Sequence, residues 1–202
     1  MREFLYYSRS APISGNFSTD LQEAGRIDIA IHTVIATFFL SHNIRKDVAL
    51  HLIFGGQPDH SKHLELKPVT EGIEGVDKIY LSKKNVSGIL RKMLYKYRKG
   101  EKREVFPGYW IEKKGFLDLA EELQNDGKQL FILDEDGEDI RKIEIGENPV
   151  FILGDHKGLP QKEFKRLKKI AKPVSIGKRA YFASQCVVIV NNELDKREER
   201  LS

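Results

Sequence analysis

The chain has few of the features that mark secreted or membrane proteins. It contains one cysteine, Cys186, which excludes an internal disulfide and fits a reducing cytoplasm. The longest apolar stretch, residues 27–40, is interrupted by Asp28, His32 and two threonines and is too short to cross a membrane as a helix. The first residues enter an apolar strand at once, without the layout of a signal peptide. We therefore expect a cytoplasmic protein that does not enter the membrane.

Metal-binding and nucleophilic patterns are also missing. No two of the six histidines lie four residues apart, as a pair of metal ligands on one helix face would, and a single cysteine cannot build a structural zinc site. Cys186 has no activating histidine beside it in the sequence, so we expect a small buried apolar side chain there rather than a nucleophile. The sequence therefore predicts no bound metal.

The segments that are present indicate one folded domain. Short apolar runs alternate with amphipathic ones: strands are expected at residues 4–7, 48–54, 64–66, 105–111, 129–133, 150–153 and near 174, and helices at residues 27–39, 86–97, 116–123 and 164–170. Pro107 and Gly108 interrupt the fourth strand, an acidic turn at 134–137 ends the fifth, and residues 186–190 fit a strand or a helix. This alternation predicts an α/β domain over residues 1–202 with a mainly parallel sheet flanked by helices, and a small projecting insertion at about 55–80.

Two of the expected strands run directly into glycine turns. One turn holds Gly154 and Gly158, and the other surrounds Gly177. Because one helix separates the two strands, both turns are expected at one edge of the parallel sheet, where open α/β sheets bind ligands. Neither turn matches a dinucleotide or P-loop fingerprint, so the pattern leaves two alternatives: a cofactor pocket of another kind, or simple chain reversal.

A segment rich in basic residues lies in the middle of the chain. Residues 83–103 hold nine lysines and arginines against one acid, Glu101, with Tyr95 and Tyr97 among them. Clustered cations bind phosphate backbones, and tyrosine rings stack on unpaired RNA bases. A net charge of +4 also favours an anionic partner, though weakly. We expect RNA binding through Arg91, Lys92, Lys96, Arg98 and Lys99; the alternative is a lysine-rich face in water.

Two polar groups are candidates for acid–base chemistry. Asp59 follows the second expected strand in a glycine-containing loop, where it can act as a general base or close an Asx turn. Arg26 and Asp28 lie on a helix whose other face is apolar, and Ser18 or Thr19 is placed to cap that helix. Spacing alone leaves Arg26 and Asp28 open as a structural ion pair or an active-site pair.

Together these motifs resemble the archaeal tRNA pseudouridine-54 N1-methyltransferases, in the trefoil-knot (SPOUT) superfamily of S-adenosylmethionine-dependent RNA methyltransferases. The resemblance covers nearly the whole chain and is carried by residues 25–28, 38–45, 56–59, 154–160, 175–177 and 183–186. Asn43 stands where the family favours glycine, and Ile176 where leucine is commoner. A pocket built largely from backbone tolerates both differences.

The resemblance implies a knot, a cofactor and a dimer. Members of the family thread the C-terminal segment through a loop, which makes the ambiguous final segment a helix, and they work as homodimers. The residues that would line the methionine and adenine pockets of S-adenosylmethionine are Leu133, Gly154, Ser175, Ile176, Gly177, Lys178 and Cys186.

The resemblance also implies methyl transfer to N1 of a pseudouridine in the T-loop of tRNA. Asp59 would take or orient the N1 proton, and Arg26, held by Asp28, would stabilise negative charge on the base carbonyls. Methylation of pseudouridine in ribosomal RNA is the alternative within the same chemistry. A non-catalytic RNA-binding dimer is the alternative outside it.

Overall fold

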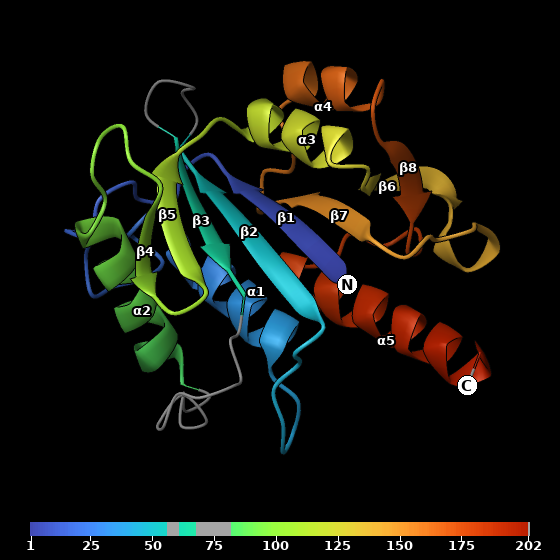
Figure 1. The fold of residues 1–202 in the computed structure, drawn as a ribbon, viewed down its shortest axis with the longest axis horizontal. Helices are drawn as coiled ribbons and strands as arrows, with labels where there is room; N and C mark the ends of the chain where they lie inside the picture. The colour runs from blue at the N-terminus through green and yellow to red at the C-terminus, as the bar shows by residue number, and fades with distance from the viewer. Residues whose placement is uncertain (56–60, 68–81, 202) are drawn as a thin grey trace.

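Eight strands pair into one sheet in the computed structural model, which describes residues 1–55, 61–67 and 82–201 (Figure 1). The elements follow the chain in the order β1 (Arg2–Ser8), α1 (Ile27–Phe38), β2 (Val48–Phe54), β3 (Lys62–Leu66), α2 (Lys83–Tyr95), β4 (Arg103–Phe106), β5 (Tyr109–Lys113), α3 (Phe116–Asn125), β6 (Gln129–Asp139), a 3₁₀ turn (Ile140–Lys142), β7 (Pro149–Gly154), α4 (Gln161–Leu167), β8 (Lys172–Ser175) and α5 (Ala183–Leu201).

The sheet has a parallel part and an antiparallel part, in the order β4-β5-β3-β2-β1-β7-β6-β8. The strands β2, β1, β7, β6 and β8 run parallel, and β3, β5 and β4 extend them in antiparallel pairs. The expected mainly parallel α/β fold is therefore confirmed. Within the expected insertion at 55–80, β3 is a regular strand of the sheet; residues 56–60 and 68–80 lie outside the described residues.

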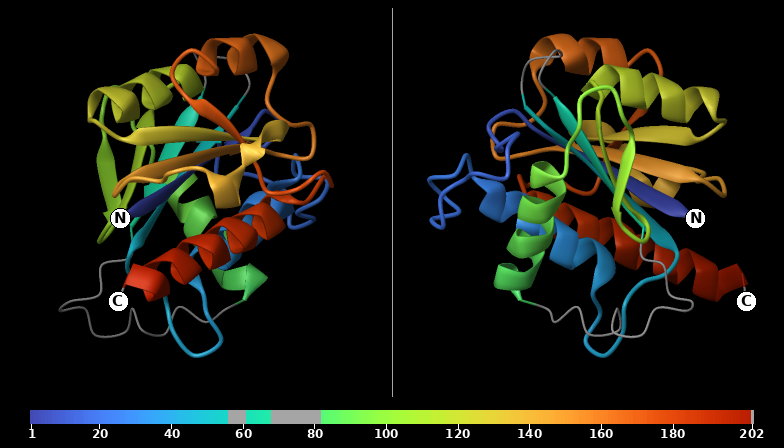
Figure 2. Two further views of the ribbon diagram at one scale, coloured as in Figure 1. Left: turned by 90° about the vertical axis from the view of Figure 1, so that its right-hand side faces the viewer. Right: turned by 60° about the vertical axis from the view of Figure 1, so that its left-hand side comes forward.

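Helices cover both faces of this sheet (Figures 1 and 2). The helices α1, α2 and α5 lie on one face, where α1 packs along α5, and α3 and α4 lie together on the other. No helix in the described part of the chain is long and apolar enough to span a membrane.

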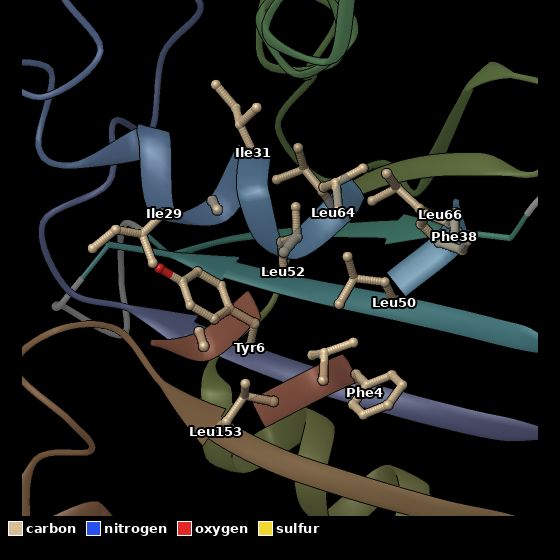
Figure 3. Close-up of a cluster of buried hydrophobic side chains, with 14 of the residues drawn as sticks. Phe4, Tyr6, Ile29, Ile31, Phe38, Leu50, Leu52, Leu64, Leu66 and Leu153 are labelled. Carbon is tan, nitrogen blue, oxygen red and sulfur yellow. The ribbon is translucent and has the colours of Figure 1, made fainter. Parts of the chain in front are cut away.

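The alternation of side chains along β1 gives the core its two halves. Phe4 and Tyr6 point toward α1 and pack with Leu50 and Leu52 of β2 (Figure 3), whereas Leu5 and its neighbours at alternate positions pack toward α3. Successive residues of a strand face opposite sides, so one central strand serves both cores. Burying each such side chain stabilises the fold by about 1.5–3 kcal/mol.

Two strands differ from the expectation. The interrupted strand at 105–111 is the hairpin of β4 and β5, whose turn uses Gly108 at a φ of +77°. The acidic turn expected at 134–137 is wrong, because β6 continues to Asp139. Its register against β8 shifts between Leu133 and Glu138, and the backbones approach so closely that a Cβ on Gly137 would lie 2.5 Å from the Val174 nitrogen.

The structure also corrects the expected cap of the first helix and decides between strand and helix for the last segment. The helix α1 begins at Ile27 rather than near Ser18 or Thr19, because Gly25 and Arg26 both have φ near +60° and break the helical path. The ambiguous C-terminal segment is the long helix α5, as the family resemblance implies and periodicity alone did not decide.

Candidate active site

The carboxyl ends of the parallel strands meet at one edge of the sheet. β1, β2, β7 and β8 end there at Ser8, Phe54, Gly154 and Ser175. On β6, Ile132 pairs with Ile152 of β7 and Leu133 pairs with Val174 of β8. Leu133 therefore lies near the strand ends at Gly154 and Ser175.

The turn after β7 is held by its own backbone. The Gly158 amide donates to the Asp155 carbonyl at 2.8 Å, and the Lys157 amide donates to the Asp155 carboxylate at 2.8 Å. A Cβ on Gly154 would lie 2.5 Å from the carbonyl carbon of Gly158, whose φ of +68° also favours glycine. Both glycines are thus required to form this turn, whether or not a ligand binds beside it.

A buried pair at this edge was missed in the sequence. The Ser8 hydroxyl donates to the Asp155 carboxylate at 2.7 Å, and Ser8 is fully buried while Asp155 is 8% exposed. Ser8 ends β1, and Asp155 follows the neighbouring parallel strand β7. Their positions at the ends of two expected strands were the only sign of this pair in the sequence. Asp155, with its hydrogen bonds to Ser8 and the turn amide, positions the turn after β7 against the end of β1.

The turn after β8 is short and open. The Ser175 hydroxyl accepts a hydrogen bond from the Gly177 amide at 3.1 Å, and Gly177 has a φ of +137°. The Lys178 ammonium reaches back to β6, 2.9 Å from the Glu135 carbonyl oxygen and 3.3 Å from the Asp136 carboxylate. Lys178 therefore connects the turn after β8 to β6 at the edge of the candidate site.

Three half-buried apolar side chains, Leu133, Ile176 and Cys186, pack against the core beside these turns. Burial raises the pKa of the Cys186 thiol to about 11, so the group is protonated at neutral pH. Gly177 has open space where a Cβ would lie. An apolar wall next to accessible backbone fits the flat, hydrogen-bonding adenine of a nucleoside cofactor.

Arg26 and Asp28 form an ion pair at the start of α1. The guanidinium Nε and Nη2 donate to the two carboxylate oxygens at 3.0 and 3.1 Å, in a bidentate arrangement. Arg26 itself adopts the left-handed backbone conformation, with φ +60° and ψ +37°, which residues other than glycine rarely adopt. The structure thus brings the two predicted residues together and stores backbone strain at the residue that carries the guanidinium.

The Tyr6 hydroxyl is a buried polar atom without a hydrogen-bond partner among the described residues. Its ring projects from β1 so that the oxygen points toward Ile29 on α1 (Figure 3). Burial raises the pKa of Tyr6, and the nearby negative charges of Asp155 and Asp28 add to that increase. Because Tyr6 is fully buried, its hydroxyl is a polar group inside the core rather than an exposed contact of the site.

Asp59 lies outside the described residues, but both ends of its loop are anchored at the same edge. The Gly55 amide donates to the Ser8 carbonyl at 3.0 Å. The Ser61 hydroxyl donates to the Gly55 carbonyl at 3.1 Å and closes the base of the loop. The chain therefore leaves and re-enters the sheet beside Ser8.

The five basic residues predicted to bind RNA divide into two groups. Four of them are exposed to solvent, as is the ring of Tyr95: Lys92, Lys96, Arg98 and Lys99. Arg91 is half-buried, and its guanidinium donates to the carbonyl oxygens of Gly15 and Phe17 at 3.1 and 2.8 Å. Arg91 thus binds the loop between β1 and α1, which also carries Arg26, to α2.

Comparisons with known proteins agree with this architecture. The model of the family described as "Putative SAM-dependent RNA methyltransferase" matches residues 1–199. A tRNA (pseudouridine(54)-N(1))-methyltransferase of Methanocella arvoryzae is 38% identical over 203 residues, covering 98% of this chain and 100% of that protein. A protein of the same name from Thermococcus kodakarensis is 37% identical over 201 residues, covering 96% of this chain and 99% of that protein.

A solved structure has a similar fold. Archaeoglobus fulgidus Nep1 bound to S-adenosylhomocysteine superposes with a TM-score of 0.63 at 13% identity, over 96% of this chain and 97% of that one. The sheet edge described above and a family match over nearly the full length lead to the same assignment. The chain belongs to the family of S-adenosylmethionine-dependent RNA methyltransferases.

Proposed function

We propose that this protein transfers a methyl group from S-adenosylmethionine to N1 of pseudouridine 54 in the T-loop of tRNA. The observation that carries the proposal is the full-length similarity to two archaeal enzymes named for that reaction. The geometry supports it, because the strand ends, the Arg26–Asp28 pair and both ends of the loop that carries Asp59 gather at one edge of the sheet.

The cofactor site is formed by the turns after β7 and β8 and by the start of α5. Leu133, Ile176 and Cys186 provide apolar contacts for the adenine, and the remaining residues, Gly154, Ser175, Gly177 and Lys178, provide accessible backbone and the rim. When bound, S-adenosylmethionine supplies a methyl group already activated on a sulfonium. The protein therefore has mainly to align an in-line attack.

In the reaction the bond from N1 to the methyl carbon forms as the bond from sulfur to that carbon breaks. The N1 proton must leave, and Asp59 accepts or orients it. Arg26, held by Asp28, stabilises the negative charge that develops on the base carbonyls. The target base has to leave its stack to reach this edge, and a loop base does so at lower cost.

The proposal extends to the RNA surface and the fold. Lys92, Lys96, Arg98 and Lys99 bind the phosphate backbone, while Arg91 contributes by holding the loop beside them. The segment that ends in α5 passes through a loop and forms the knot of the trefoil-knot superfamily. The enzyme works in the cytoplasm, where Cys186 stays reduced.

The homodimer uses the outer face of α1 and α5. A shallow apolar groove there is lined by Ile35, Ala36, Val188 and Ile189, and Val188 is 54% exposed, which is unusual for a large apolar side chain. Pairing two copies through this face covers the groove. Val188→Asp should shift the protein from dimer to monomer in sedimentation velocity while leaving the circular dichroism spectrum unchanged.

The decisive experiment compares two otherwise identical tRNA transcripts, one with pseudouridine and one with uridine at position 54. N1-methylpseudouridine, detected by mass spectrometry of digested nucleosides, should form only with the pseudouridine transcript. A ribosomal-RNA fragment that contains pseudouridine is assayed beside them. If only this fragment is methylated, the protein carries out the same reaction on ribosomal RNA. Tight RNA binding without any methylated product would show a non-catalytic RNA-binding protein and overturn the proposal.

A further inference from the structure

A row of buried polar side chains crosses the sheet from β1 to β5. His51 on β2 lies between two partners: its Nε2 is 3.0 Å from the Glu3 carboxylate, and its Nδ1 is 2.9 Å from Nε2 of His63 on β3. The Nδ1 of His63 is in turn 3.0 Å from the Glu112 carboxylate on β5. Glu3, His51 and His63 are at most 3% exposed, so water does not mediate these contacts.

The hydrogen bonds of this row cannot all be made by neutral histidines. Three contacts need three protons, and two neutral imidazole rings carry two. Carboxylates accept, so each ring directs its N–H outward, to Glu3 or to Glu112. That leaves two ring lone pairs, on Nδ1 of His51 and Nε2 of His63, facing each other at 2.9 Å. Two converging lone pairs require a cation between them, either an additional proton or a metal ion.

Glu65 provides a third ligand atom at this point. It lies directly opposite His51 in the antiparallel register of β2 and β3, and the ligand atoms of His51, His63 and Glu65 all lie within 4.8 Å of one another. We propose that these three residues form a binding site for one divalent transition-metal ion, with Zn²⁺ as the best fit and water as the fourth ligand. Two imidazoles and a carboxylate are a donor set that Zn²⁺ accepts in tetrahedral sites. The site lies beyond the proposed methyl transfer and does not depend on it.

The surrounding carboxylates are arranged as metal sites require. Ligating histidines almost always donate their other ring N–H to a carboxylate or carbonyl, which fixes the ring. Here Glu3 and Glu112 do so for both rings, and each is held by a lysine, Lys128 at 2.7 Å and Lys114 at 2.9 Å. Two nitrogens on a tetrahedral Zn²⁺ lie about 3.3 Å apart, so the rings need to separate by only about 0.4 Å.

Two lysines compete with the metal for Glu65. The Lys67 and Lys102 ammonium groups each lie 2.7 Å from a Glu65 oxygen, and both side chains are more than 40% exposed. A bound ion must displace at least one of them into water. Removing one lysine should therefore strengthen metal binding, the opposite of removing a ligand.

The test uses the full-length protein, stripped with a chelator and titrated with Co²⁺ and then with Zn²⁺ at pH 7.5. We expect one equivalent of Co²⁺ with the intense visible absorption of a tetrahedral site, which Zn²⁺ abolishes. His51→Gln and His63→Gln should weaken Zn²⁺ binding at least tenfold, and Glu112→Gln by about 10–100-fold. His42→Gln, at an exposed histidine beyond α1, is the matched control and should leave binding unchanged.

Lys102→Met should have the opposite effect and tighten Zn²⁺ binding, because it removes an ammonium group that competes for Glu65. Circular dichroism establishes whether each variant is folded. If the histidine variants do not fold, the ¹⁵N shifts of Nδ1 of His51 and Nε2 of His63 in the wild-type protein decide, because both should move when Zn²⁺ is added. A wild-type protein without a Co²⁺ spectrum and without those shifts overturns the site. So does Zn²⁺ binding that survives in folded His51→Gln and His63→Gln proteins.

Discussion

The Arg91 guanidinium lies 3.9 Å above the ring of Phe17 and donates to the Phe17 carbonyl at 2.8 Å, so an arginine of the basic segment is committed inside the protein. Lys96, the residue that follows α2, differs in this respect and is exposed to solvent. The two kinds of basic residue should therefore respond to substitution in different measurements.

Arg91→Ala should lower the free energy of unfolding by about 2 kcal/mol, because charged hydrogen bonds to two carbonyls and a contact with an aromatic ring are lost. Lys96→Ala should change it by less than about 0.5 kcal/mol, yet weaken tRNA binding and reduce its salt slope by about one. Urea denaturation and RNA binding between about 50 and 200 mM salt measure the two effects. Equal losses of stability in both variants would contradict this division.

Arg26 offers a way to separate backbone strain from chemistry. Arg26→Gly relieves the left-handed conformation and should raise Tm relative to Arg26→Ala by about 2–4 °C. Both variants lose the guanidinium and should lose methyl transfer to the same extent. A thermal scan and a single-turnover assay give the two readouts. Activity retained in the glycine variant would remove Arg26 from the reaction.

Tyr6→Phe tests the unpartnered hydroxyl. Because a buried polar atom without a partner costs about 1–3 kcal/mol, removing it should raise the unfolding free energy by about 1 kcal/mol. The ring remains to fill the core. Urea denaturation of the ligand-free protein provides the measurement. A loss of stability of similar size would mean that the hydroxyl has a bound water or another partner.

Acid should weaken the attachment of α5. Asp195 accepts from Arg45 at 2.8 Å and from Arg2 at 2.7 Å, and these hydrogen bonds outweigh burial and lower the pKa of Asp195. A carboxylate with a lowered pKa stabilises the fold above its unfolded value, about 3.9, and that contribution is lost as the pH falls through the folded pKa. Between pH 5 and pH 3 the wild-type protein should lose more stability than Asp195→Asn. Identical pH profiles would contradict this.

The sequence predicted the elements that depend on local pattern. The helices α1, α2 and α3 and the parallel strands follow from periodicity, and Pro107 and Gly108 mark the turn of the β4–β5 hairpin. The expected cap of α1 at Ser18 or Thr19 was wrong, because the backbone conformation of Gly25 and Arg26, rather than a side-chain cap, sets the start of this helix. Periodicity did not decide the final helix, which came from the resemblance alone.

Contacts between strands were harder to predict. The candidate active-site residues were found through glycine turns and family motifs, but Ser8 and Asp155 meet only because β1 and β7 are neighbours in a particular register. Histidine spacing along helices gives no sign of the proposed metal site. His51, His63 and Glu65 lie on two antiparallel strands, where a shift of one residue would turn each side chain to the other face.

The position of the candidate site at the ends of the parallel strands also determines at which stage of folding it forms. The proposed site draws on Arg26, Ser175 and Cys186, from both ends of the chain, and these residues come together only when β1 lies beside β7 and α5 lies along α1. Contacts so distant in sequence close large loops and form slowly. A chain still emerging from the ribosome therefore lacks a working pocket until its last helix is made. Recovery of cofactor binding during refolding would time the final step of assembly, whereas the spectroscopic signal of the early helices would not.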